Sequence, residues 1–552
     1  MKSFGKVSTV ISCIGLALPI CFLIFFWTQI VVKRPIDFWG IPWDSPIMSL
    51  SHAINIDFWL IGGEKRELGT PQLIHPGLIY QVISWVLYRL TSGDITGSPL
   101  ELFQHALIDP SNYWGALQYV PLFLSILSIA LIWQVSRQNN VIIFLAAIAS
   151  YFIASPTARF GVYDFFNESS SLLMASVFFI AANHYFKRTQ TLAREHVGKT
   201  VLFGFIGSLM YMHKMNYVIW ALSAVSGFIV LALLDRSNRK VVVVNLLIYL
   251  GSLVAFIVIL SALLFGDVHG VIRMLKLHVG LIAHSGVYWA GPRDVFSVDT
   301  MVNAFRTLLA YHTLFVYFGL VSLALISGTI FRKRKDAEWL KKYLPAAAVL
   351  TTALLIMTLA ILKHLVPYYI VSIAAIYPFI LLWLANSEMK RPLIIAAPLI
   401  LIAAFSFFGP SNIFDAELRN REGEMAYAKE TLEDVEKIKS EFPLGEKNRF
   451  WMYRIIAPEF QRIFIVEFTS RQDLYGPLHQ LQGNEYQFSP WHGNVYYDGS
   501  WSHQLKDVPW KYLVADTSGL SSVNRAVHEW LDDPSFKKVK YKRLTLIINP
   551  QL

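Results

Sequence analysis

The sequence predicts an α-helical polytopic membrane protein with about 11 transmembrane helices and a C-terminal extracytoplasmic α/β domain. Three observations predict this class. Of the 552 residues, 55% are hydrophobic and only 16% are charged, and the mean hydropathy is +0.45, which is too apolar for a soluble domain of this length. Apolar runs of about membrane-spanning length recur as far as residue 408. From residue 409 the chain turns polar, starting with GPSNIFDAE.

The first apolar run, 8–32, is interpreted as an uncleaved membrane helix. It is longer than the roughly 7–15 apolar residues of a signal peptide and ends in WTQIVVKRP. Its two cysteines, Cys13 and Cys21, are eight residues apart. One helix would separate them by roughly 12 Å, which is too far for a disulfide. The other predicted spans are 113–136, 140–156, 167–186, 199–213, 216–234, 241–266, 307–330, 343–362, 367–386 and 392–408.

The distribution of charge predicts the orientation. Residues 411–552 hold 18 Lys and Arg against 20 Asp and Glu, so this part has a net charge of −2. Because the whole chain has a net charge of +10, residues 1–410 carry +12. With eleven spans, the loops on the N-terminal side hold 18 Lys and Arg and the opposite loops hold 12. The positive-inside rule then places the N-terminus in the cytoplasm. Counting the apolar segment 74–90 as a span would break this pattern, so we expect it to be a helix at the membrane surface.

Two domains follow from this orientation. Residues 1–408 form a membrane module with large outer loops at 33–112 and 267–306, and 409–552 form an outer domain. The outer domain opens with the charged helical stretch EMAYAKETLEDVEKIKS. Strand-like runs follow, namely RFWMYRI, RIFIVEF, WKYLVAD and RLTLIIN. Nucleic acid is not an expected partner, because membrane orientation explains the basic excess.

Ionisable residues gather in the loops predicted to lie outside. Asp44 follows the first span, and His75 precedes Pro76 just before the surface helix. The short second loop, SPTARFGVYDFFNESSS, carries Arg159, Asp164 and Glu168. Charges at a membrane boundary are costly unless solvated or paired, so these residues are functional candidates. Helix capping and snorkelling are the competing explanations.

Later turns add cations to the same face. Lys214 lies between two apolar halves in YMHKMNY, which predicts contact with an aqueous cavity or an anion. The turn LKHLVPYYI adds Lys363 and Tyr368. Cations suit the phosphate of a lipid carrier, and a carboxylate suits a base that activates a hydroxyl.

The segment 277–294, LHVGLIAHSGVYWAGPRD, is a candidate lid over the substrate. It carries His278, His284 and Tyr288. HxxxH and HExxH spacings are absent, so no metal site is assigned, although a divalent metal is not excluded. No cofactor is expected.

The order of these motifs resembles that of the C-type glycosyltransferases, which use polyprenyl-phosphate sugars. The order is an acid after the first helix, HP before a surface helix, R…D…E in the second loop, HK in a later turn and KHxxPYY near the end. The bacterial aminoarabinose transferases of lipid A and the protein O-mannosyltransferases have the most similar pattern. The resemblance covers roughly residues 1–390.

The resemblance implies a role for each matching residue. Asp44 matches the catalytic base, although Ser45 stands where the family often has a second acid. Glu168, or else Asp164, matches the second-loop acid. The residues at the basic and tyrosine positions of the family would bind the donor phosphate, together with a nearby arginine. These residues are His75, Arg159, Lys214, Lys363 and Tyr368.

The resemblance also implies partners and a location. The donor is a polyprenyl-phosphate-linked sugar, the acceptor is a lipid, protein or polysaccharide, and the membrane is the bacterial inner membrane. Three alternatives stay open. These are a transporter or flippase for a lipid-linked sugar, a glycan polymerase or ligase using a diphosphate carrier, and a membrane-anchored receptor.

Overall fold

The computed structural model forms two compact units, which are described separately. The first comprises Met1–Val31, Thr70–Val82 and Gln118–Asp415, and the second comprises Val32–Gly69, Ile83–Leu117 and Ala416–Leu552. The described residues are 2–31, 44–64, 77–93, 96–136, 141–155, 158–159, 162, 167–188, 197–265, 268–283, 297–363, 369–387, 393–409, 413–452, 455, 462, 465–466, 469, 471–488, 494–497, 500–516 and 533–550.

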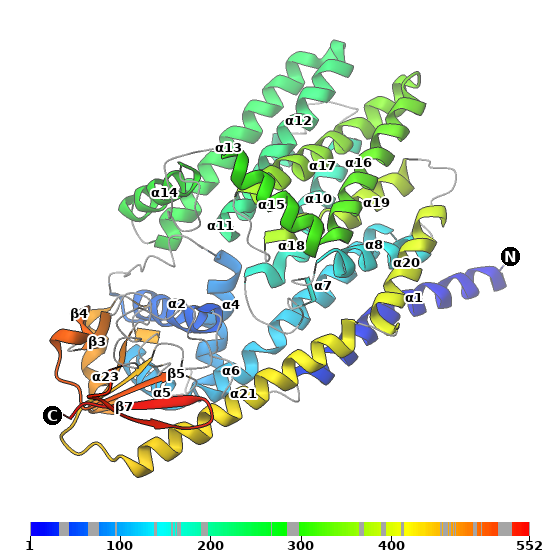
Figure 1. The fold of residues 1–552 in the computed structure, drawn as a ribbon. Helices are drawn as coiled ribbons and strands as arrows, with labels where there is room; N and C mark the ends of the chain where they lie inside the picture. Colours follow the sequence, from blue (N-terminus) through cyan, green and yellow to red (C-terminus); the bar gives the residue numbers. More distant parts are fainter. Residues whose placement is uncertain are drawn as a thin grey trace. The chain divides into compact units, whose positions relative to one another are not determined.

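The first unit is built from helices (Figure 1). The described residues of the eleven predicted spans are almost all helical, which confirms the helical class. Among the described residues, five helices are long and apolar enough to cross a membrane, and the number eleven stays a prediction. The five are Ser111–Ser136, Met215–Leu234, Arg236–Phe265, Thr313–Lys333 and Ala337–Lys363. The main helices of the unit are α1 (Lys2–Val31), α7 (Tyr119–Ser136), α8 (Val141–Ala154), α10 (Ser171–Arg188), α11 (Val197–His213), α12 (Val218–Leu234), α13 (Arg239–Phe265), α16 (Thr313–Lys333), α17 (Ala337–Lys363), α19 (Tyr377–Asn386) and α20 (Leu393–Phe408).

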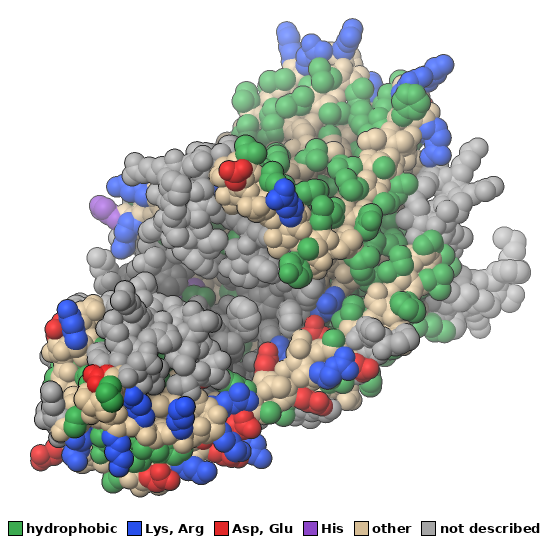
Figure 2. All heavy atoms as spheres, viewed as in Figure 1, with side chains coloured by type: hydrophobic (Ala, Val, Ile, Leu, Met, Phe, Trp, Pro, Cys, Tyr) green, Lys and Arg blue, Asp and Glu red, His purple; other side chains and the backbone are tan. Residues whose placement is uncertain are grey.

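The surface of this unit is apolar along its helices and basic at one helix hairpin. Along α13 the side chains of Leu247, Val254 and Leu263 are exposed, although they are large and hydrophobic. Exposed Arg239 and Lys240 lie at the end of the α12–α13 hairpin, and Figure 2 shows this basic tip above the apolar flank. An apolar flank with a basic end is the pattern of a helix hairpin in a bilayer.

Small residues allow the helices to approach closely. A Cβ at Gly227 of α12 would lie 2.6 Å from Phe186 of α10 and 2.8 Å from Val349 of α17. A Cβ at Gly204 of α11 would lie 2.9 Å from the Tyr249 carbonyl of α13. Glycine is therefore required at both contacts, as is common where helices pack within membranes.

The predicted outer loop 267–306 contains more helix than expected. Helix α14 (Val268–Ala283) occupies the first part of the expected lid, 277–294. Its buried residues Val271, Met274 and His278 recur at helical spacing and face the unit. The expected span 307–330 is also interrupted at His312, where α15 (Val298–Tyr311) ends before α16 begins.

The second unit combines helices with a seven-stranded sheet of order β4-β3-β2-β1-β5-β7-β6. Strand β1 pairs in parallel with β2 and with β5, and the other pairs are antiparallel. The predicted strands near the C-terminus are thereby confirmed as a sheet. The elements are α2 (Asp44–Leu60), α4 (Leu78–Thr91, which begins in the first unit), α5 (Pro99–Ile108), α6 (Ser111–Leu117), α21 (Ile413–Glu441, which also begins there), α23 (Tyr475–Gln482), β1 (Arg449–Met452), β2 (Glu485–Phe488), β3 (Asn494–Tyr497), β4 (Ser500–Gln504), β5 (Tyr512–Asp516), β6 (Lys537–Lys540) and β7 (Leu544–Ile548).

One predicted strand is wrong. In the run 462–468, the described residues Ile465 and Val466 are helical and buried. Ile465 and Thr469 contact α2, and neither residue belongs to a strand of the sheet. Ser51 Oγ donates to the Ile465 carbonyl over 2.9 Å, and Asn55 Nδ2 donates to the Thr469 carbonyl over 3.0 Å.

A buried ion pair joins α2 to α4 in the second unit. The Asp57 carboxylate is fully buried and accepts two hydrogen bonds from Arg89, from Nε over 2.5 Å and from Nη2 over 2.7 Å. Trp85 Nε1 donates to the same carboxylate over 2.9 Å. A carboxylate with this many donors tolerates burial, whereas one that has lost its cation does not.

We therefore predict that Arg89→Met destabilises the second unit by about 3–5 kcal/mol, because Asp57 would be left charged and buried. Hydrogen exchange of the α2 and α4 amides should accelerate accordingly. The exposed pair between Lys542 and Glu433 supplies the control, and Lys542→Met should change stability by at most about 0.5 kcal/mol. Equal exchange in the two variants would contradict the prediction.

Candidate functional site

The candidate site is centred on the break between α11 and α12. The break consists of Lys214, which has extended backbone (φ −154°, ψ 133°), followed by the short helix η4 (Met215–Tyr217). The Lys214 side chain is only 2% exposed, and its Nζ lies 4.9 Å from the centre of the Tyr369 ring. Burial holds the pKa of the Lys214 ammonium well below its usual range, because desolvation penalises the charged form.

His213 joins three separate segments at this break. Its carbonyl accepts a hydrogen bond from the Gly77 amide over 3.1 Å. Its Nε2 is 2.5 Å from Ser170 Oγ. Its ring centre lies 5.4 Å from that of Tyr80 and 5.8 Å from that of Tyr217. His213 is fully buried, so these contacts fix its orientation from all sides.

These contacts bring four predicted motif segments together. Gly77 comes two residues after His75, Ser170 belongs to the short helix η2 (Asn167–Ser170) that carries Glu168, and Tyr369 follows Tyr368. The fourth segment is the His213–Lys214 pair itself. The segments are widely separated in sequence, and all of them belong to the first unit.

Buried hydroxyl groups lie in the segments that contact His213. Ser171 Oγ lies 2.5 Å from the Tyr217 hydroxyl, and the Tyr80 hydroxyl is buried beside Ser169. Burial raises the pKa of Tyr80, which therefore stays neutral and able to donate. A buried lysine next to segments that carry neutral hydroxyl donors is suited to binding an anion such as a phosphate.

Three other predicted residues have described positions in the first unit. Arg159 is buried, and its Nη1 donates to the Phe152 carbonyl over 3.1 Å, so it satisfies the C-terminal end of α8. Lys363 is half-buried at the last residue of α17. His278 is buried on α14, where its Nδ1 is 2.7 Å from the Tyr211 hydroxyl.

The remaining predicted residues are described in part or not at all. Asp44 is the first residue of α2, a helix that we did not expect there, and it belongs to the second unit. Glu168 lies in η2. The side chains of Asp44 and Glu168 lie outside the described residues, as do His75, Asp164, His284, Tyr288 and Tyr368 altogether.

The sequence motifs include Tyr369 as the last residue of KHxxPYY and His213 as the neighbour of Lys214, whereas Ser170, Tyr80 and Tyr217 were not predicted to belong to the site. Tyr369 stood next to a predicted tyrosine, which was the one available signal. Among the described residues, no group of three or more His, Cys, Asp and Glu side chains is placed to hold a metal ion. No protein-family profile matches the chain, and no curated protein is detectably similar in sequence.

We predict that anion binding at Lys214 weakens with rising pH, and that this weakening occurs at pH values well below the usual lysine pKa. The lowered pKa means that the ammonium loses its proton, and its attraction for a phosphate, earlier than an exposed lysine does. Titrating polyprenyl phosphate against the protein between pH 6 and pH 10 measures the effect. Lys214→Arg should flatten the profile, because arginine keeps its charge throughout. Identical profiles for the variant and the wild type would contradict the assignment.

We also predict that His213→Phe loosens η2 while leaving the aromatic packing in place. The variant keeps a ring beside Tyr80 and Tyr217 but leaves Ser170 without its partner, at a cost of about 1–3 kcal/mol. Hydrogen exchange in residues 167–170 should accelerate roughly tenfold or more. The control, His278→Phe, removes the bond to Tyr211 on α11 and should leave η2 unchanged. Acceleration in both variants would mean that the effect is not specific to His213.

Proposed function

We propose that the protein is a glycosyltransferase that moves a sugar from a polyprenyl-phosphate donor to an acceptor hydroxyl. The observation that carries the proposal is the convergence of four motif segments on His213 and Lys214. The motifs resemble those of the C-type glycosyltransferases in order, and the buried Lys214 suits the phosphate that the donor releases.

The proposed reaction is a single displacement. Asp44 accepts the proton of the acceptor hydroxyl as its oxygen attacks C1 of the sugar. The bond between C1 and the phosphate oxygen breaks, and polyprenyl phosphate leaves with the bonding electrons. The leaving phosphate needs charge stabilisation more than a proton, and Lys214 supplies it, with Lys363 and His75 as further candidates. One displacement inverts the configuration at C1.

Glu168 would position the acceptor or a cation. The Arg159 guanidinium donates to the Phe152 carbonyl, which leaves fewer of its N–H groups for a phosphate. The proposed setting is the outer face of a bacterial inner membrane, with the N-terminus in the cytoplasm. The acceptor class, whether lipid, protein or polysaccharide, is left open.

A transporter of lipid-linked sugars is the second candidate function. The favouring observation is the placement of Lys214 at a break between apolar helices, since transporters bind anionic groups at such breaks. A transporter would bind the donor without cleaving it. The presence or absence of free polyprenyl phosphate after incubation therefore separates the two functions.

We predict that the purified protein releases polyprenyl phosphate and glycosylates a component of a cell-envelope extract. Mass spectrometry would follow both products from a panel of polyprenyl-phosphate sugars. Asp44→Asn should lower turnover by roughly 10²–10⁴-fold, because the asparagine side chain has nearly the shape of aspartate but cannot act as the base. Asp473→Asn, an exposed position of the second unit, is the control and should retain wild-type turnover. Full turnover in Asp44→Asn would remove Asp44 from the mechanism.

A further inference from the structure

Helices α14 and α15 each present an exposed apolar stripe on the surface of the first unit. On α15 the stripe consists of side chains at i, i+4, i+7 and i+11, which lie along one side of a helix. On α14 the spacing is i, i+3 and i+7, which has the same result. Each of these large apolar side chains is between 41% and 72% exposed. They are Val298, Val302, Phe305 and Leu309 on α15, and Ile272, Leu275 and Val279 on α14.

The rest of α15 is divided between a buried side and a polar side. Ala304 and Leu308 are buried, and the helix contacts α16 and α17. The polar side carries Asp299, Asn303 and Arg306, which are exposed. At roughly 100° per residue, the exposed apolar stripe lies between these two sides. Helix α15 therefore has one side for protein, one apolar side and one polar side.

Helix α14 has the same three sides, but its polar side is basic. The buried side packs on α13, and its His278 is bonded to Tyr211 of α11. The polar side carries His269, Arg273 and Lys276, which are exposed. The exposed apolar stripe again lies between the buried side and the polar side. The two helices thus share one design and differ in the charge of the polar side.

The exposed apolar surface continues from these helices into their neighbours in the chain. Helix α13 ends just before α14, and Ile259 and Leu263 near its end are exposed. Helix α16 follows α15 after His312 alone, and its Leu314 and Tyr317 are exposed. Both α13 and α16 belong to helices that are long and apolar enough to cross a membrane. The stripes therefore extend the surface that such helices offer to lipid.

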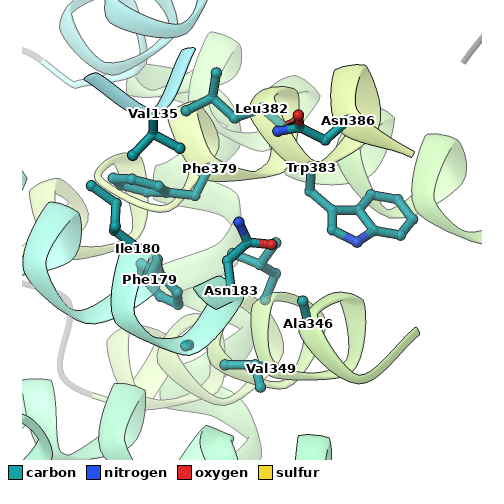
Figure 3. A pocket seen from close by; sticks show the side chains of 12 residues that line it. Val135, Phe179, Ile180, Asn183, Ala346, Val349, Phe379, Leu382, Trp383 and Asn386 are labelled. Carbon is teal, nitrogen blue, oxygen red and sulfur yellow. Dashed lines mark hydrogen bonds between the residues drawn. The ribbon is translucent and has the colours of Figure 1, made fainter. Parts of the chain in front are cut away.

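An internal pocket of the same unit does not offer a comparable contact for lipid. It lies among α7, α10, α17 and α19, and Figure 3 shows the Asn183 amide among apolar side chains there. Its volume is about 30 Å³, which is room for about two waters and far too small for an acyl chain. Lipid therefore contacts these helices from outside that pocket.

We propose that α14 and α15 lie at the boundary between the headgroups and the acyl chains of one phospholipid leaflet, with their exposed apolar stripes in the lipid. A helix with three such sides fits this boundary, because it contacts protein, acyl chains and water at once. The basic side of α14 adds a preference for anionic headgroups, whereas the mixed charges of α15 add none. Continuity with membrane-crossing helices favours lipid over a second copy of the chain. The proposal does not depend on the proposed glycosyl transfer.

Nitroxide labels on the full-length protein in phosphatidylcholine vesicles test this placement. The exposed native cysteines are replaced by Cys13→Ser and Cys21→Ser, and single labels are attached at Val302→Cys and at Asn303→Cys. These neighbours are both exposed but lie on the apolar and the polar side. Oxygen concentrates among acyl chains, and a nickel chelate stays in water. The ratio of oxygen to nickel collisions should be roughly fivefold higher at Val302→Cys than at Asn303→Cys.

Two outcomes of the label experiment would overturn the placement. Equal collision ratios at the two positions would mean that the stripe of α15 is not in lipid. A label at Val302→Cys that collides with neither reagent would mean that protein covers the stripe, as a second copy of the chain would.

A label at Val279→Cys tests the preference of α14 for anionic headgroups. Replacing about a third of the phosphatidylcholine by phosphatidylglycerol should raise the collision ratio there roughly twofold and leave the ratio at Val302→Cys unchanged. Arg273→Gln with Lys276→Gln should abolish the rise, whereas Arg273→Lys with Lys276→Arg should retain it. The absence of a rise at Val279→Cys, or a rise that survives the glutamine pair, would overturn the preference.

Discussion

The backbone break at the end of α11 is the constraint on which the candidate site depends. An apolar helix that stops among other helices leaves carbonyl groups without intrahelical partners, and such groups are costly away from water. The His213 carbonyl is satisfied by the Gly77 amide, which fixes Gly77, the residue before α4, against the break. The His213 side chain then fixes η2 through Ser170. One break therefore determines the positions of two elements that are distant from it in sequence.

The burial of Lys214 follows from the same break. A residue in extended backbone between two helices cannot direct its side chain along a helix surface to the aqueous boundary, as a snorkelling lysine does. Its ammonium is instead packed against the Tyr369 ring. The cost of that desolvation is what lowers the pKa, and a bound anion would offset the cost. A site that is poorly solvated when empty is well suited to a ligand that brings the opposite charge.

The sequence predicted the apolar helices, the charged helix α21 and strands β1, β5 and β7, because each has a strong periodic or compositional pattern. It did not predict α2, because that helix buries Ser51, Asn55 and Asp57 and so lacks an amphipathic pattern. It assigned 462–468 to a strand because the run is rich in Ile, Val and Phe, yet the described residues Ile465 and Val466 are helical, and the Ile465 carbonyl is bonded to α2. Lys214 was predictable as a cation between apolar runs. Ser170 and Tyr80 contact its neighbour His213, and Tyr369 contacts Lys214 itself, but these contacts link residues far apart in sequence, so no local pattern predicts them.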